Sequence, residues 1–312
     1  MIANMSLLVG DNPFHGISHL SQERARERFV EQNRGITEQA VRLVELCLEN
    51  GANGFMFSVD EITLSIIKEL GKSDKTGNVS LYAIVPYAYE YVRKATQTGG
   101  VSALAKKLAK EMIFSSNVKV IALNVGGLVR FNPSSLLKAY VAYELSRIKS
   151  VVSDGVCLKS VMLHEIITDM ALALDMDQLF KSYIEFMEES GVRPGFETRN
   201  FAYLSKKFNE WNIDFSKITL TSSFNKVGFQ MCPSKSECEE ALELVRGAEV
   251  IAMSILAAGY LKPAQAVDYL ADLKGISGVV VGVSKEVQAT ETFRVLREGL
   301  NKSSKPDSLH YA

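Results

Sequence analysis

Segments with the pattern of buried strands alternate with segments patterned as helices along the chain, and this alternation restricts its fold more than any other feature. Val279, Val280 and Val281 form the clearest strand, because an uninterrupted β-branched run is typical of a parallel strand covered on both faces. Residues 37–48 form the clearest helix, with apolar positions at helical spacing and a stop at Gly51. The alternation predicts one α/β domain built on a parallel sheet.

The number of predicted strands favours a barrel. Nine strands over 312 residues fit a (β/α)8 TIM barrel with one extra or one misassigned strand. A doubly wound open sheet is less favoured, because residues 10–14 lack the glycine pattern of a dinucleotide-binding turn. We predict a single barrel domain over residues 1–300 and a polar tail at 301–312. The strands are Leu7–Gly10, Gly54–Val59, Leu81–Tyr87, Val118–Val125, Ser160–Glu165, Pro194–Asn200, Ile218–Phe224, Glu249–Leu256 and Val279–Val283.

Two helix boundaries in the second half are predicted from local patterns. After the strand Ser160–Glu165, the next helix is expected at Met176–Ser190 and ends at Gly191. Ser236 and Glu239 have the spacing of a capping box, which predicts a helix over Ala241–Val245.

Composition argues against several classes of protein. Charged residues make up 23% of the chain and the net charge is −1, which argues against an electrostatic nucleic-acid binder. The apolar runs are only long enough for strands, so no membrane span is expected, and the first residues do not resemble a secretion signal. Four cysteines without a CxxC spacing are expected to be reduced packing residues of a cytoplasmic protein. The expected partner is a small molecule, and no pattern specifies the oligomeric state.

Polar residues stand at the predicted strand ends, where the active site of a barrel lies. If they converge on one mouth, the chain is an enzyme. The candidates are Asp11, Asn12, His15, Asp60, Tyr87, Asn124, His164, Glu165, Glu197, Arg199, Asn200, Asn225 and Ser254.

His164 is the strongest candidate, because it stands near the end of a predicted core strand, where its imidazole would lie at the rim of the barrel. There it could act as acid, base, hydrogen-bond donor or metal ligand, or it could merely bond a neighbouring backbone group. Since successive strand residues face opposite sides, Glu165 should not share its direction. We expect Glu165 to orient a neighbour or to bind a lysine outside the barrel.

The acidic candidates leave alternatives open. A buried Glu197 needs a partner, and Arg199, two residues on, points the same way. The two could form a structural ion pair or bind a substrate. The guanidinium of Arg199 is well suited to bind a carboxylate or phosphate group. Asp11 and His15 could bind a metal, or Asp11 and Asn12 could cap the turn.

The corner after the last predicted strand could hold an anion. Gly282 permits a close approach of the backbone, and Ser284 can cap the helix that follows. The first N–H groups of a helix carry partial positive charge and bind phosphate readily. The alternative is an ordinary connection between strand and helix.

The order of motifs in the second half resembles the aldo-keto reductase superfamily. Leu158–His164 is similar to the family's strand that ends in the histidine of its catalytic site. Glu189–Arg193 followed by Arg199–Phe201 resembles the helix end and strand whose asparagine contacts the nicotinamide. Ala252–Leu261 resembles the strand and glycine loop beneath the cofactor, and Val281–Lys285 the segment that binds its 2′-phosphate.

The resemblance implies NADP as cofactor, with specific departures. Gly282, Ser284 and Lys285 would hold the phosphate, Asn200 and Asn225 the nicotinamide end, and His164 would polarise a carbonyl. Where the family has its catalytic aspartate, this chain has Met56 or, farther on, Asp60, and residues 63–67 contain no tyrosine. The strand expected to carry the lysine reads Ala-Ile-Val-Pro-Tyr over residues 83–87, so a phenol could come only from another position such as Tyr87.

Three hypotheses follow. The first is an NADP-dependent oxidoreductase. The second is a lyase, isomerase or hydrolase whose phosphorylated or carboxylated substrate is bound by the Gly282–Ser284 corner and Arg199, with His164 and Glu197 as acid and base. The third is a barrel that has lost catalysis. Catalytic roles are predicted for His164, Glu197 and Asp60, substrate binding for Asp11, Asn12, Tyr87 and Arg199, and, as a variant, a divalent metal held by Asp11, His15, His164 and Glu197.

Overall fold

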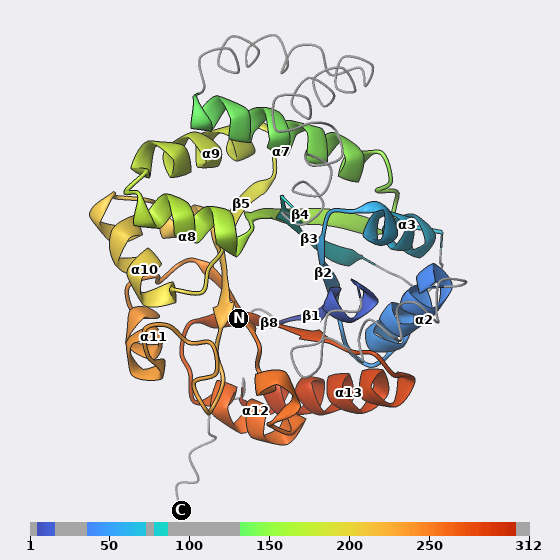
Figure 1. The fold of residues 1–312 in the computed structure, drawn as a ribbon. Coiled ribbons are helices and arrows are strands. Elements are labelled where there is room, and N and C mark those ends of the chain that lie inside the picture. Colours follow the sequence, from blue (N-terminus) through green and yellow to red (C-terminus); the bar gives the residue numbers. More distant parts are fainter. Residues whose placement is uncertain (1–4, 16–35, 73–77, 87–131, 304–312) are drawn as a thin grey trace, which may run out of the picture.

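Hydrogen bonds between the first strand, β1 (Ser6–Gly10), and the last, β8 (Ile276–Gly282), close eight parallel strands into a barrel. The computed structural model describes residues 5–15, 36–72, 78–86 and 132–303. Each strand pairs with its neighbours in sequence, so the chain is the predicted (β/α)8 TIM barrel (Figure 1). The other strands are β2 (Gly54–Ser58), β3 (Val79–Val85), β4 (Val156–Leu163), β5 (Arg193–Glu197), β6 (Thr219–Ser223) and β7 (Glu249–Met253).

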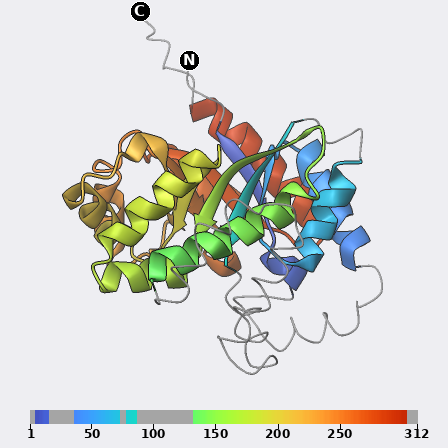
Figure 2. The ribbon, with the colours of Figure 1, turned by 90° about the horizontal axis from the view of Figure 1, so that it is seen from above.

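The helices surround the ring of strands, as the two views in Figures 1 and 2 show. The last helix packs against both its predecessor and α2, which closes the outer layer across the junction of β1 and β8. The helices are α2 (Ile36–Glu49), α3 (Glu61–Leu70), α7 (Pro133–Lys149), α8 (Glu165–Ala173), α9 (Asp177–Glu189), α10 (Phe201–Glu210), α11 (Lys235–Ala241), α12 (Pro263–Ala271) and α13 (Glu286–Ser303). Short 3-10 turns are η1 (Asn12–His15), η2 (Phe215–Lys217) and η3 (Ala257–Gly259).

Both faces of the strands are buried, as the β-branched run of the last strand predicts. Val279 and Val281 join the core between strands and helices, whereas Val280 packs against the side chains that fill the barrel. Those interior side chains are Leu8, Met56, Tyr82, Ile84, Met162 and Ile251. Because side chains alternate along a strand, the residues two positions farther along face the mouth at the carboxyl end.

A polar network fills the opposite, amino end of the barrel. The hydroxyl of Tyr82 donates to Glu249 at 2.6 Å, and the hydroxyl of Thr219 donates to the other carboxylate oxygen at 2.9 Å. Arg193 donates to the carbonyl of Ile218 at 2.8 Å. Burial and the carboxylate of Glu249 raise the pKa of Tyr82, so its hydroxyl stays protonated. The network therefore fills part of the barrel interior at the amino end with polar groups that satisfy one another.

Eight strands complete the barrel, so the ninth predicted strand is not needed for closure. That strand, Val118–Val125, and Asn124 within it lie outside the described residues. The end of the third predicted strand at Tyr87 also lies outside them, and β3 ends at Val85.

The helix predicted over Met176–Ser190 is confirmed as α9, but one helix was not predicted and another was misplaced. A helix, α8, directly follows β4, although its sequence is rich in β-branched residues and lacks a Ser, Thr, Asp or Asn cap. The helix expected over Ala241–Val245 lies earlier, at Lys235–Ala241, and its cap is Ser234 with Glu237 rather than Ser236 with Glu239. Both pairs have the same spacing, so the sequence pattern alone does not distinguish them.

The cysteines and the helices add two findings about the described residues. Cys47 and Cys238 are buried packing residues with free thiols, whereas the free thiols of Cys157 and Cys232 are exposed. Within the described ranges, no helix has an apolar stretch long enough to cross a bilayer.

Candidate functional site

The carboxyl ends of the strands bring small and polar residues together at the mouth of the barrel. Alternation from the interior residues Leu8, Met56, Met162 and Val280 directs the next inward positions toward it. Those positions are Gly10, Ser58, His164 and Gly282. The same alternation along β5 and β6 gives Glu197 and Ser223. Four of these six positions carry glycine or serine, so the imidazole and the carboxyl are the largest side chains among them.

The imidazole of His15 lies between two carboxylates. Its Nε2 is 3.1 Å from Oδ2 of Asp11 and its Nδ1 is 3.2 Å from Oδ2 of Asp60. A neutral imidazole carries one N–H, so only the doubly protonated ring donates to both carboxylates. The arrangement links the ends of β1 and β2 across the mouth.

The two carboxylates are themselves held by backbone groups. Oδ2 of Asp11 accepts a hydrogen bond from the N–H of Ser58 at 2.6 Å. Asp60 is the N-cap of α3, and its Oδ1 accepts from the N–H of Thr63 at 2.9 Å in a capping box. These contacts give both aspartates a structural role beside the catalytic and substrate-binding roles predicted for them.

The four residues suggested as metal ligands are not brought into one group. Among the residues that the structure describes, no three His, Cys, Asp or Glu side chains are arranged to hold a metal ion. Each ring nitrogen of His15 lies within hydrogen-bond distance of a carboxylate oxygen.

His164 caps α8 with its ring. Nδ1 accepts a hydrogen bond from the N–H of Ile166 at 3.2 Å. Burial lowers the pKa of His164; the carboxylate of Glu165 opposes this shift and Arg199 adds to it. The ring is therefore neutral near pH 7 with its proton on Nε2, and in the described part of the chain no hydrogen-bond acceptor contacts that N–H. It can be donated to a ligand in the mouth.

Glu197 is a buried carboxyl beside this imidazole. The register pairs Leu163 with Phe196, which places the next residues, His164 and Glu197, on adjacent strands at the same level. Oε2 of Glu197 accepts a hydrogen bond from the backbone N–H of Glu165 at 3.3 Å. Burial, and then the charge of Glu165, raise the pKa of Glu197 to about 8, against the opposing effect of Arg199. The carboxyl therefore changes protonation close to neutral pH, as expected of an acid–base group.

Arg199 pairs with Glu165 and not with Glu197, which corrects the pair expected from the sequence. Nε of Arg199 donates to Oε2 of Glu165, and Nη1 donates to Oε1 of Gln230. The reason is α8, which was not predicted and which places Glu165 at the rim beside the guanidinium. Glu165 thus orients a neighbour, as expected, but it binds an arginine rather than a lysine.

The turn that carries Arg199 is fixed from α8. Oδ1 of Asp169 accepts from the hydroxyl of Thr198 at 2.5 Å, and Oδ2 accepts from the backbone N–H of Arg199 at 3.1 Å. The N–H of Asn200 donates to Thr198, and the side chain of Asn200 caps α10. Burial raises the pKa of Asp169, while its two hydrogen bonds act in the opposite direction.

Sequence reasoning missed Asp169 and Gln230, and it assigned no role to Thr198 and Ser223, although both stand at predicted strand ends. Asp169 lies on the unpredicted α8, and Gln230 lies in a connection without a strand or helix pattern. For Gln230 and Ser254 the backbone φ angles are 58° and 54°, a conformation that non-glycine residues seldom adopt. Only the polar residues at strand ends had a recognisable signal.

The residues predicted to bind NADP have other partners. Both ends of the buried Asn225 amide bond the backbone of Phe229, at 2.8 Å each. A Cβ on Gly282 would lie 2.8 Å from Cδ of Pro13, so close packing against Pro13 requires this glycine. Ser284 and Lys285 are exposed, and both the N–H and the hydroxyl of Ser284 bond Gln288.

The structure gives little support to a substrate-binding role for Asn12 and does not describe Tyr87. Asn12 is exposed at the start of η1, and Tyr87 lies outside the described residues.

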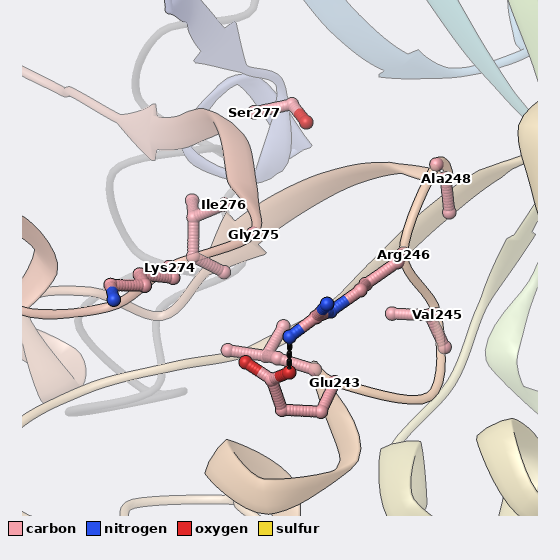
Figure 3. A pocket seen from close by; sticks show the side chains of 10 residues that line it. Glu243, Val245, Arg246, Ala248, Lys274, Gly275, Ile276 and Ser277 are labelled. Carbon is pink, nitrogen blue, oxygen red and sulfur yellow. Dashed lines mark hydrogen bonds and ion pairs between the residues drawn. The ribbon is translucent and has the colours of Figure 1, made fainter.

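A shallow hollow of ≈ 370 Å³ lies at the other end of the barrel, where the chain enters β7 and β8 (Figure 3). There Arg246 pairs with Glu243, and Lys274 also lines the hollow, whereas His164 and Glu197 do not.

Comparison with solved structures identifies the fold. The chain folds like an aldo-keto reductase. A protein from Pseudomonas aeruginosa assigned to that class aligns with a TM-score of 0.55 at 11% identity, over 94% of this chain and 90% of that one. An aldo-keto reductase from Bacillus halodurans in its holo form aligns with a TM-score of 0.52 at 12% identity, over 96% and 92%.

A barrel of another class fits almost as well. A protein from Anabaena variabilis assigned as a sugar phosphate isomerase/epimerase aligns with a TM-score of 0.50 at 10% identity, over 96% of this chain and 100% of that one. No family model matches the sequence, and no curated protein matches it. At these identities the comparisons define the fold, which enzymes of both classes share.

Proposed function

We propose that this chain is a non-redox enzyme, an isomerase or lyase, that moves a proton on the carbon next to the carbonyl group of a small polar substrate. The observation that carries the proposal is the pair formed by His164 and Glu197 at the mouth. One presents a neutral imidazole N–H, and the other is a buried carboxyl that titrates near neutral pH.

His164 would polarise the carbonyl. Because Nδ1 is occupied by the N–H of Ile166, the ring can offer only its Nε2–H. A neutral imidazole at the start of a helix is a suitable donor to a carbonyl oxygen that gains negative charge during enolisation. The lowered pKa of His164 keeps the ring neutral over the pH range in which Glu197 titrates.

Glu197 would move the proton. In its ionised form it takes a proton from the carbon next to the carbonyl, the C–H electron pair forms the enolate double bond, and the carbonyl π electrons move to the oxygen, to which His164 donates a hydrogen bond. Where that carbon carries a hydroxyl group, an isomerisation is complete when Glu197 returns its proton to the former carbonyl carbon and the hydroxyl proton passes to the former carbonyl oxygen. An elimination is complete when the enolate expels a leaving group, with its bonding electrons, from the next carbon and the carbonyl forms again. A base with a pKa of about 8 suits this task, because it is ionised in part of the molecules at neutral pH.

The test is exchange of substrate hydrogen with solvent. The protein is incubated in D2O with pyruvate, glyceraldehyde or dihydroxyacetone phosphate, and loss of the C–H signal is followed by proton NMR. We expect exchange with at least one compound, and Glu197→Gln should slow it by about 10²–10⁴-fold. Glu249→Gln is the matched control, because it removes a carboxyl from the opposite end of the same barrel. Equal exchange in Glu197→Gln and in the unaltered protein would refute the role of Glu197.

An NADP-dependent reductase is the second candidate, favoured by the fold similarity to the aldo-keto reductases. The residues themselves do not fit the cofactor well, because the Asn225 amide is fully engaged by Phe229 and both donors of Ser284 are engaged by Gln288. In the described residues, no tyrosine hydroxyl or lysine ammonium bonds His164 or Glu197. Titration with NADPH, followed by nicotinamide fluorescence, separates the two candidates. Saturable binding that Lys285→Ala weakens would favour the reductase.

A further inference from the structure

We propose that the mouth contains an anion subsite formed by Arg199 and Ser223. In the free protein Glu165 pairs with the guanidinium of Arg199, and a carboxylate or phosphate group of the substrate competes with Glu165 for it. The inference rests on the proposed function, because it names the group that would orient the substrate against His164 and Glu197. It places the anion between β5 and β6 rather than at the Gly282–Ser284 corner after β8.

Arg199 has donors left for a ligand. The structure uses Nε for Glu165 and Nη1 for Gln230, and no acceptor in the described part of the chain bonds Nη2. The side chain is 32% exposed, so a ligand in the mouth can reach it. The turn that carries it is held rigidly by Asp169, which reduces the cost of ordering the guanidinium around an anion.

Ser223 supplies the second, independent observation. Its side chain is fully buried, and its hydroxyl has no hydrogen-bond partner within the described residues. A buried hydroxyl without a partner carries a desolvation penalty, which a ligand that accepts its proton would remove.

The strand register brings this hydroxyl and Arg199 to the same edge of the mouth. Glu197 lies opposite Thr221, and the N–H of Thr198 donates to the carbonyl of Thr221 at 3.0 Å, so the backbone contact between the two segments continues one residue past the end of β5. The hydroxyl of Ser222 also donates to the carbonyl of Thr198, at 2.8 Å, and Arg199 and Ser223 are the next residues of the two segments. Thr221 faces the interior, where its hydroxyl contacts the sulfur of Met162, so Ser223 faces the mouth.

The neighbouring carboxylates do not prevent an anion from binding here, because most already have partners. Asp11 and Asp60 hold His15, Asp169 holds backbone and hydroxyl donors, and the raised pKa of Glu197 leaves its carboxyl protonated in most molecules at pH 7. Glu165 is the exception, since it neutralises Arg199 directly at the rim. An incoming anion must therefore compete with Glu165, and removal of that charge should strengthen binding.

The test is calorimetric titration of the intact protein with inorganic phosphate and, separately, with acetate. We expect one of these anions to bind. Glu165→Gln should tighten that binding about tenfold, whereas Arg199→Gln should weaken it by about tenfold or more and Ser223→Ala by a smaller factor. The probe that binds more tightly distinguishes a phosphate substrate from a carboxylate substrate. Glu165→Gln is decisive, because misfolding would not tighten binding.

The controls separate this proposal from its alternatives. Arg246→Gln and Glu243→Gln break an exposed Arg–Glu pair at the other end of the barrel and should leave affinity unchanged. Unchanged affinity in Arg199→Gln and Ser223→Ala, weakening in Lys285→Ala alone, or no binding to either the unaltered protein or Glu165→Gln would each overturn the subsite. Absence of deuterium exchange combined with the expected binding pattern would instead refute the proton transfer and leave the anion subsite standing.

Discussion

The backbone N–H of Glu165 donates a hydrogen bond to Oε2 of Glu197 at 3.3 Å. The first residue of α8 therefore supports the buried carboxyl at the end of β5, while the side chain of the same residue holds Arg199. His164, the preceding residue, caps that helix with its ring. One short helix thus positions the imidazole, the carboxyl and the guanidinium on which the proposed chemistry depends.

The raised pKa of Glu197 makes stability depend on pH in a defined direction. Between the ordinary carboxyl pKa of 4.5 and the native value of about 8, Glu197 is ionised in the unfolded chain but protonated in the folded one. The unfolded state then binds fewer protons, so this residue lowers the free energy of unfolding by about 1.4 kcal/mol for each pH unit of increase. The contribution is constant above pH 8.

Glu197→Gln removes this titration. We expect the variant to gain stability relative to the unaltered protein as the pH rises from 5.5 to 7.5, measured by urea unfolding at three pH values. Glu243→Gln, which removes an exposed carboxylate, should keep the slope of the unaltered protein. Parallel curves for Glu197→Gln and the unaltered protein would show that Glu197 is ionised in the fold.

His164 has two roles, as the cap of α8 through Nδ1 and as a hydrogen-bond donor through Nε2–H, and substitutions can separate them. His164→Asn retains a side-chain oxygen that can accept the N–H of Ile166, whereas His164→Ala removes the acceptor and should destabilise the fold by about 1 kcal/mol. Both variants lose the Nε2–H, so both should lose deuterium exchange. If His164→Asn is stable and retains full exchange, the imidazole is only a helix cap.

The outline of the fold could be predicted from the sequence because it follows from patterns that are local. The valine run at 279–281 and the apolar stripe of α2 each mark a buried element without reference to the rest of the chain. The same reasoning placed His164 and Glu197 at strand ends, since a barrel brings such ends together.

The contacts within the site could not be predicted in the same way. They depend on α8, which an imidazole caps in place of the usual Ser, Thr, Asp or Asn, and so no capping pattern marks its start. Without α8, Arg199 has no visible partner except Glu197, which is the pairing that the structure corrects. The pairs that His15 forms with Asp11 and Asp60 likewise join the ends of two strands that are about 45 residues apart in sequence. No local pattern can indicate such a contact.

Asp60 holds the start of α3 and one side of His15, and two variants distinguish these roles. Asp60→Asn retains an oxygen for the N–H of Thr63 but loses the charge that faces His15. Asp60→Ala loses both and should be less stable than Asp60→Asn by about 1 kcal/mol, the usual effect of a lost N-cap. Thermal unfolding of both variants measures the difference. Equal stability would show that the cap contributes nothing to the folded state.

Gly282 is required by its neighbour Pro13, and this can be tested without any ligand. A Cβ at position 282 would lie 2.8 Å from Cδ and 2.9 Å from Cγ of Pro13, closer than real Cβ contacts. Gly282→Ala should therefore destabilise the protein by about 1–3 kcal/mol, as overpacking does elsewhere. Gly10→Ala is the milder control, because the nearest atom to its Cβ would be in the side chain of Val280, at 3.2 Å.

The double variant decides whether the steric explanation is right. Replacement of Pro13 by Ala removes the ring atoms that would clash, so Gly282→Ala should cost less stability in the Pro13→Ala background than in the unaltered protein. Urea unfolding of the four proteins of this cycle gives the coupling free energy between the two positions. A coupling near zero would mean that position 282 needs glycine for another reason, and the phosphate role predicted from the sequence would then become the leading explanation.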